Sequence, residues 1–227
     1  MKAMVLAAGR GERMRPLTDT TPKVLLAAGG KPLIVYHLEA LARAGVREVI
    51  INLSWLGEQI RTALGTGERY GLSLSYSEEG PHALETGGGI YQALPLLGSA
   101  PFLVVNADNW TDFDFGALAR MKLGAADDAR IVLVPNSPHH PAGDFGLQGD
   151  RVINTETGRL TYAGIGIYQA AFFAGCAPGR FPLLPLLQRA IAAGRLRGQL
   201  HAGAWFDIGS AERLAALEAR LRAKAMR

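Results

Sequence analysis

Glycines and basic residues near the start of the chain could bind phosphate groups. Gly9 and Gly11 follow a short apolar run, and Arg13 and Lys23 come after them, with further arginines between. Glycines placed so let backbone N–H groups approach phosphates closely, and arginine forks and a lysine charge suit a triphosphate. A Walker loop is excluded because no Gly-Lys-Ser/Thr follows, and a dinucleotide fingerprint because Met14 occupies its third small position. A solvated basic loop is the alternative interpretation.

A candidate metal ligand, Asp108, lies two residues past the end of the run 102–106. An aspartate just past the carboxyl end of a buried parallel strand lies where open α/β sheets bind ligands. Its hard carboxylate oxygens suit Mg²⁺. A helix or turn cap is the alternative, although Asp112 and Asp114 are better cap candidates because they directly precede or open an expected helix over 113–123.

A third candidate is the run of three glycines from Gly87 to Gly89, which follows Thr86 and precedes an expected helix over 89–97. Consecutive glycines cost backbone entropy, so a close approach by another group is the functional interpretation. A flat base or a sugar ring would fit this description. A plain flexible turn is the alternative.

Composition excludes several classes of protein. The 227 residues are 48% hydrophobic and 19% charged, which is far too apolar for a disordered chain. No apolar run approaches the roughly 18–20 residues of a membrane span, and no signal peptide is expected. The single Cys176 suggests a reducing compartment, so we expect a cytoplasmic protein. The net charge of +4 suits an anionic small molecule and does not demand nucleic acid.

The elements that must position these residues alternate between strands and helices in the first part of the chain. Strands are expected at 2–7, 48–53, 72–76, 102–106 and 129–134. Helices are expected between them at 32–44, 55–64, 89–97 and 113–123. This order predicts an α/β fold with a mixed, mostly parallel sheet flanked by helices.

The pattern changes after residue 135. A polar stretch rich in Pro and Gly is followed by expected strands at 151–154, 160–168 and 199–201, and by expected helices at 181–193 and 210–226. We interpret this part as small α+β insertions on the same sheet. The prediction is therefore one domain, 1–227, made of a first part, 1–135, and a second part, 136–227.

Several segments together resemble the sugar-1-phosphate nucleotidyltransferase family. Residues 2–23 carry its long signature, here L-A-A-G-R-G-E-R-M-R-P-L-T followed by P-K. In chain order, Leu84–Gly89 resembles the family's base-binding loop, Asn106–Asp108 its metal site, Asp144–Gly146 its sugar-site turn, and Trp205–Ser210 its second metal site. The resemblance covers essentially the whole chain and implies a single-domain Rossmann-like fold.

The chain also departs from the family pattern. Ala107 stands where glycine is usual, and adds a Cβ beside the metal site. The common E-K-P segment, whose lysine touches the sugar phosphate, has no match, and Arg159 is the nearest substitute. Glu85 replaces a glycine of many relatives, a variant of the branch that acts on N-acetylmuramic acid 1-phosphate.

That branch gives the expected activity, which is transfer of UMP from UTP to N-acetylmuramic acid 1-phosphate in peptidoglycan recycling. The products would be the UDP-sugar and pyrophosphate. A hexose-1-phosphate guanylyl- or thymidylyltransferase, for example for mannose 1-phosphate, is the first alternative. A non-catalytic regulator that binds nucleotide sugars is the second.

The resemblance also assigns residues. Arg13 and Lys23 are the expected catalytic cations, and Asp108 and Asp207 the expected Mg²⁺ ligands. The nucleotide is expected at Gly9, Gly11, Glu12, Arg13, Lys23, Glu79, Thr86 and Gly87, and the sugar at Asn106, Asp144, Gly146, Glu156 and Gly164. UTP and a sugar 1-phosphate are the expected partners of a monomer that binds neither nucleic acid nor membrane.

Three further residues are expected to pack rather than react, namely His37, Trp55 and Trp110. His82 lies near the expected base loop and is a weaker candidate for contact with the nucleotide.

Overall fold

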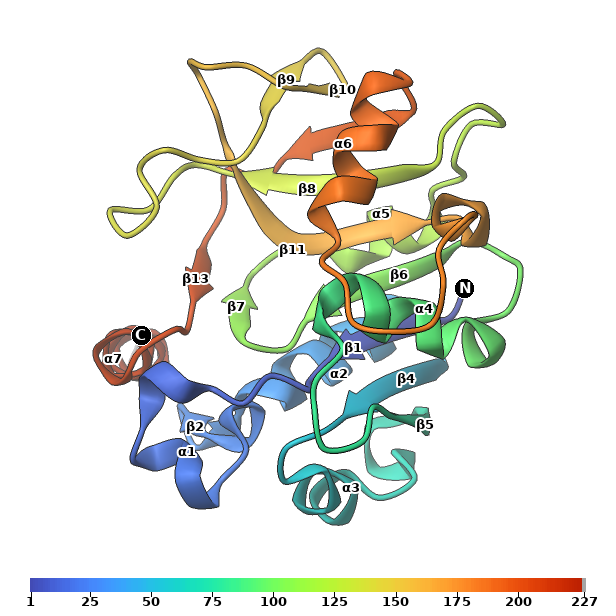
Figure 1. Cartoon of the computed structure of the whole chain (residues 1–227). Helices are drawn as coiled ribbons and strands as arrows, with labels where there is room; N and C mark the ends of the chain where they lie inside the picture. Colours follow the sequence, from blue (N-terminus) through green and yellow to red (C-terminus); the bar gives the residue numbers. More distant parts are fainter. Residues whose placement is uncertain (226–227) are drawn as a thin grey trace.

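The apolar runs of the chain build one nine-stranded sheet in a computed structural model that describes residues 1–225. Its strand order is β5-β4-β1-β6-β11-β8-β12-β10-β9, and all strands except β10 and β11 run in the same direction (Figure 1). The strands are β1 Ala3–Leu6, β4 Glu48–Leu53, β5 Ser73–Glu78, β6 Phe102–Asn106, β8 Ala129–Val134, β9 Gly146–Gln148, β10 Arg151–Ile153, β11 Thr161–Tyr168 and β12 Leu196–Leu200. The expected α/β fold with a mixed, mostly parallel sheet is confirmed.

Helices and short pairs of strands surround this sheet. The α-helices are α1 Leu17–Thr20, α2 Leu33–Arg43, α3 Gly57–Leu64, α4 Glu85–Leu97, α5 Phe115–Arg120, α6 Leu184–Ala192 and α7 Ala211–Ala225. Two small antiparallel pairs join β2 Ala27–Ala28 to β3 Lys31–Pro32, and β7 Asn109–Thr111 to β13 Trp205–Asp207. Short 3-10 helices lie at Glu12–Met14, Lys23–Leu25, Glu68–Tyr70 and Ala170–Phe173.

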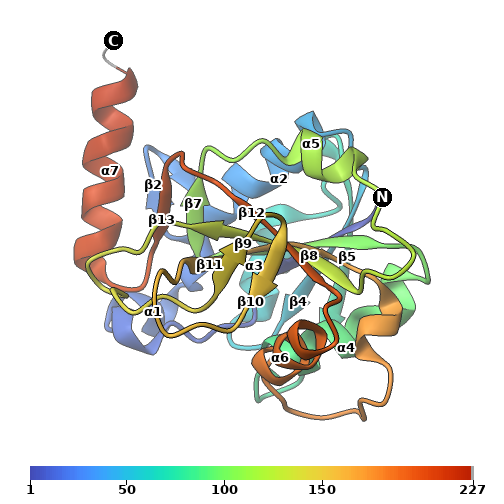
Figure 2. The same cartoon turned by 90° about the horizontal axis from the view of Figure 1, so that it is seen from above.

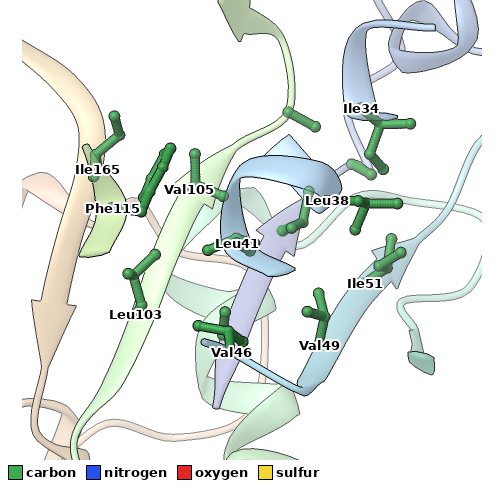
Figure 3. Close-up of a cluster of buried hydrophobic side chains, with 14 of the residues drawn as sticks. Ile34, Leu38, Leu41, Val46, Val49, Ile51, Leu103, Val105, Phe115 and Ile165 are labelled. Atoms are coloured by element: carbon green, nitrogen blue, oxygen red, sulfur yellow. The ribbon is translucent and has the colours of Figure 1, made fainter. Parts of the chain in front are cut away.

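Both faces of the sheet are covered because its buried strands are apolar on both sides. Along β1, Ala3 and Val5 join one core cluster while Met4 joins the other, as the period of two requires. The first cluster is completed by α2, α3 and α5, and Figure 3 shows Leu38 and Leu41 of α2 packed over the strands. The second cluster is completed by α4 and α6.

A third, smaller cluster fixes the C-terminal helix beside the start of the chain. Leu217 of α7 is fully buried with Met14, Trp110 and Ile208. The helix therefore lies along β2 and β13 at the side of the molecule (Figure 2). Trp110 packs in the core as expected. No helix in residues 1–225 has the length and apolar character that crossing a membrane requires.

The three consecutive glycines were expected in a loop before a helix, but they lie within the helix. Gly87 to Gly89 lie inside the first turns of α4, which begins at Glu85 rather than at residue 89. A Cβ at Gly87 would lie 2.6 Å from the ring of Phe181, and one at Gly88 would meet the carbonyl oxygen of Gly179. The close approach is therefore made by this chain's own loop, which packs on the helix.

Other boundaries shift by a few residues. Strand β12 begins at Leu196 rather than at residue 199, and the three-residue strands β7 and β9 were not expected. The helix expected over 113–123 is the shorter α5. Asp114 caps it, as expected, by accepting a hydrogen bond of 2.8 Å from the Gly116 N–H.

The packing of α4 makes a testable prediction. Replacing glycine by alanine inside a helix ordinarily stabilises a protein by about 0.5–1 kcal/mol. Gly88→Ala should do the opposite and lower the free energy of unfolding by about 1–3 kcal/mol, because the added methyl group meets a backbone oxygen. Urea unfolding followed by circular dichroism measures this. Leu96→Ala, at an exposed position of the same helix, is the control, and a stabilised Gly88→Ala would contradict the packing.

Candidate active site

A cavity of about 650 Å³ opens at the carboxyl ends of the parallel strands. The register places Leu6 of β1 opposite Asn52 of β4 on one side and Asn106 of β6 on the other. All three residues line the cavity. Strand order reverses about β1, and such a switch point is where open α/β sheets bind ligands.

The glycine loop after β1 forms one wall of the cavity. Gly9 is exposed, and a Cβ there would meet nothing within 4 Å. Gly11 has φ +69, and a Cβ there would lie 3.0 Å from Thr18 and 3.1 Å from Lys23. The Thr18 hydroxyl donates a hydrogen bond of 2.8 Å to the Gly11 carbonyl. This turn requires glycine, and it leaves an open backbone facing the cavity above Lys23.

Lys23 joins the loop to the end of β6 through an ion pair. Its Nζ lies 2.7 Å from a carboxylate oxygen of Asp108, with only 7% of the lysine side chain exposed against 41% for the aspartate. A buried ammonium group needs such a partner because desolvation of an unpaired charge is costly. The two residues were expected on phosphate and metal respectively, and the structure brings them together.

Asp207 reaches the same region through the small β7–β13 pair. Asp207 lies opposite Asn109, and the Ile208 N–H donates a hydrogen bond of 3.0 Å to the Asp108 carbonyl. The Asp207 carboxylate forms an ion pair with Arg213. Strand pairing therefore brings the two expected metal ligands into neighbouring segments.

These residues fit a magnesium ion. Mg²⁺ in proteins is commonly bound by one or two carboxylates together with substrate phosphates. Asp108 lines the cavity, whereas Asp207 does not and lies in the strand that pairs with the segment after Asp108. The two carboxylates therefore come from neighbouring segments, and residues 1–225 contain no cluster of three or more metal-binding side chains. An ion held here would depend on phosphate oxygens for its other ligands.

On the other side of the cavity, hydrogen bonds link three elements. The Ala7 N–H donates to Asn52 over 2.7 Å, the Asn52 amide donates to Glu79 over 2.6 Å, and the Leu84 N–H donates to the second Glu79 oxygen over 2.6 Å. Burial raises the pKa of the Glu79 carboxyl, against the lowering effect of the bonds from Leu84 and Asn52. Each oxygen keeps a free lone pair, so the expected contact of Glu79 with the base stays a prediction.

Asn52 was missed by sequence reasoning. Its signal is a polar residue near the end of the otherwise apolar run EVIINL, the same signal that singled out Asn106. Its partners, in other elements, could not be identified from the chain order. Asn52 connects the glycine loop to Glu79 and so positions both walls of the cavity.

The entrance to α4 contributes Glu85 and Thr86 to the cavity lining, while Gly87 is buried behind them against Phe181. Glu85 has φ 61, an unusual conformation for a residue with a side chain, and forms an ion pair of 2.9 Å with Arg180. Arg180 also lines the cavity and was not singled out from the sequence.

Two aromatic residues that the sequence analysis considered also line the cavity. Trp55 lines the cavity with Arg10 stacked over its ring at 4.6 Å, rather than lying in the core. His82 lines the cavity as well. His37, by contrast, is a buried structural residue, as expected, whose ring nitrogen lies 2.8 Å from the Asn109 carbonyl.

The residues expected to bind the sugar fall into two groups. Asn106 lines the cavity, and Gly164, with φ +71, lies against it so closely that a Cβ would be 2.7 Å from the Asn106 amide carbon. Asp144 accepts a hydrogen bond of 2.7 Å from the Tyr162 N–H and pairs with His140 at 3.0 Å. Asp144 is not among the residues that line the cavity, and its role in sugar binding stays a prediction.

Gly146 and Glu156 also lie outside the cavity lining. Gly146 of β9 packs against Thr155, where a Cβ would lie 2.6 Å from the threonine methyl group. Glu156 is exposed on the loop after β10. Their expected contacts with the sugar likewise stay predictions.

Comparison with known proteins places the chain in a family. Residues 2–157 match the family model described as nucleotidyl transferase. A Neisseria meningitidis serogroup B protein named N-acetylmuramate alpha-1-phosphate uridylyltransferase is 50% identical over 220 residues, which cover 94% of this chain and 95% of the relative. A Caulobacter vibrioides protein of the same name is 37% identical, and the match covers 96% of each chain.

A solved structure supports the fold independently. A Bacillus anthracis protein in complex with sucrose superimposes with a TM-score of 0.87 at 21% identity, covering 98% of this chain and 95% of that one. The family match extends over more than half of the chain, and both curated relatives match it along nearly their whole length. The chain belongs to the nucleotidyl transferase family.

Proposed function

We propose that this protein transfers UMP from UTP to N-acetylmuramic acid 1-phosphate and releases pyrophosphate, as a cytoplasmic enzyme of peptidoglycan recycling. The observation that carries the proposal is the Lys23–Asp108 ion pair beneath the glycine loop, in a cavity at the strand ends. The 50% identity to a relative named for this activity supports the choice of base and sugar.

Electrostatic repulsion between the substrates, more than proton transfer, limits this reaction. The second pKa of a phosphate monoester is about 6, so the sugar phosphate is already ionised near neutral pH and needs no general base. One of its oxygens attacks the α-phosphorus in line, a new P–O bond forms, and the bond from the α-phosphorus to the bridging oxygen breaks. The electron pair leaves with pyrophosphate. The obstacle is the approach of two polyanions, which positioned cations reduce.

The chain's own residues supply this positioning. The backbone around Gly9 and Gly11 holds the triphosphate, with Glu12 at the ribose and Arg13 at the β- and γ-phosphates. Lys23 lies beneath the same loop and neutralises charge at the α-phosphate or the sugar phosphate. Thr86 and Asn106 both line the cavity, and we assign Thr86 to the base and Asn106 to the sugar.

Asp108 and Asp207 would hold Mg²⁺. A bound Mg²⁺ supplies charge stabilisation for phosphoryl oxygens without the need for a proton donor. In the structure these two carboxylates pair with Lys23 and Arg213.

The proposed activity is tested by pyrophosphate release. With UTP and Mg²⁺, the protein should turn over N-acetylmuramic acid 1-phosphate far faster than glucose 1-phosphate or mannose 1-phosphate. Turnover of mannose 1-phosphate with GTP, and none with the muramic acid substrate, would contradict the base and the sugar while leaving the reaction class. If no pair of nucleotide and sugar phosphate is turned over, the proposal that the protein is an enzyme is contradicted.

Lys23→Met should lower kcat/KM by about 10²–10³-fold, since it removes a buried cation from the site of charge development. Lys31→Met is the matched control because its ion pair with Glu39 lies outside the cavity lining, and it should retain activity within about twofold. Steady-state kinetics with thermal unfolding of both variants makes the measurement. A Lys23→Met enzyme of near wild-type kcat/KM would exclude the assigned role.

Asp207→Asn keeps the size of the side chain and a hydrogen-bond acceptor for Arg213, but removes a charge from the proposed ion site. We expect Mn²⁺ affinity, measured by electron paramagnetic resonance, to fall at least about tenfold, and turnover at limiting Mg²⁺ to fall with it. Asp19→Asn, at an exposed carboxylate paired with Arg15, should change neither. Unchanged metal affinity and turnover in Asp207→Asn would refute the metal assignment.

A further inference from the structure

None of the family motifs assigns Arg213, which pairs with the proposed metal ligand Asp207. It lies in the first turn of α7, and its backbone N–H donates to the Ser210 hydroxyl. Its guanidinium group forms an ion pair with Asp207, and 19% of the side chain is exposed. The side chain is thus held against Asp207 and not free in solvent, although Arg213 is not among the residues that line the cavity.

A second guanidinium group meets Arg213 above Gly209. A Cβ built on Gly209 would contact the Arg213 guanidinium and lie 3.1 Å from a terminal nitrogen of Arg13. The two arginines come from the 3-10 helix Glu12–Met14 and from α7, at opposite ends of the chain. They converge here because Leu217 of α7 is buried with Met14, the neighbour of Arg13.

The two guanidinium groups differ in their partners. Arg213 pairs with Asp207 and lies near the Glu212 carboxylate in the same turn of α7. Within residues 1–225 the Arg13 side chain makes no hydrogen bond and no ion pair, so the charge without a partner at this point is that of Arg13. Arg13 and Gly209 both line the cavity, so this charge faces the space open to a ligand.

Arginine forks bind phosphate oxygens through two parallel hydrogen bonds, which a lysine cannot match. The short distance between two like charges also favours an anion placed between them, because each guanidinium then gains an attraction. Gly209 lets both guanidinium groups approach its backbone, since a Cβ there would collide with Arg213.

We propose that Arg213 is the second arm of a phosphate clamp with Arg13, and that its ion pair with Asp207 is a resting contact exchanged for phosphate oxygens when ligand enters. A cation held by Asp207 would repel the guanidinium group, and the phosphate beside Gly209 is the nearest new partner. We identify the bound anion as the terminal phosphates of the nucleotide, and this identification rests on the proposed function.

The test is the affinity of the full-length protein for inorganic pyrophosphate, measured by isothermal titration calorimetry with and without Mg²⁺. Arg213→Met should raise the Kd at least about tenfold, the loss of one charge-assisted pair. Arg222→Met is the matched control, since this exposed arginine of the same helix pairs with Glu218 and should leave the Kd within twofold. A Kd of Arg213→Met within twofold of wild type would overturn the clamp.

If Arg213→Met does not fold, Arg213→Lys makes the same test. It keeps the charge beside Asp207 but loses the fork, so the pyrophosphate Kd should rise at least threefold, and an unchanged Kd would overturn the proposal. Pyrophosphate carries neither base nor sugar. A positive binding result therefore supports the clamp even if UTP and the muramic acid substrate are not turned over. A negative binding result refutes the clamp even if these substrates are turned over.

Discussion

The parallel pairing of β1 with β4 and β6 is the constraint on which the rest of the site depends. It fixes Leu6 between Asn52 and Asn106, so three loops with chemically active residues leave the sheet at one edge. The apolar residues on both faces of these strands cannot change register without exposing a core cluster to solvent. The hydrophobic core therefore also sets the relative positions of the glycine loop and the Asp108 carboxylate.

Polar contacts then hold the charged side chains at this edge in place. Asn52 and Glu79 tie the glycine loop to the entrance of α4, while Lys23 and Arg213 pair with the two carboxylates proposed for magnesium. Each of these ion pairs costs desolvation energy, which the attraction between its partners offsets. Under the proposed function, a phosphate group or a metal ion replaces one partner of each pair.

The sequence predicted the main strands well, because buried parallel strands read as short apolar runs, and the long signature around Gly9 and Gly11 indicated the glycine loop after the first of them. It did not predict Gly87 to Gly89 as part of α4, since the loop at Gly179 that packs on them is distant in the chain. The approach of Asp207 to Asp108 came only from family resemblance; in the structure it depends on the three-residue strands β7 and β13, too short to recognise by pattern. Arg213 had no motif at all, and only its convergence with Arg13 over Gly209 revealed it.

The most direct test of this account is a crystal structure of the protein with Mg²⁺, a non-hydrolysable UTP analogue and N-acetylmuramic acid 1-phosphate. The account predicts the triphosphate along Gly9 to Gly11, the uracil beside Thr86, the sugar beside Asn106, and Lys23 bonded to a phosphate oxygen. A nucleotide bound elsewhere, or a triphosphate in the cavity with no contact to Lys23 or to the glycine loop, would contradict it.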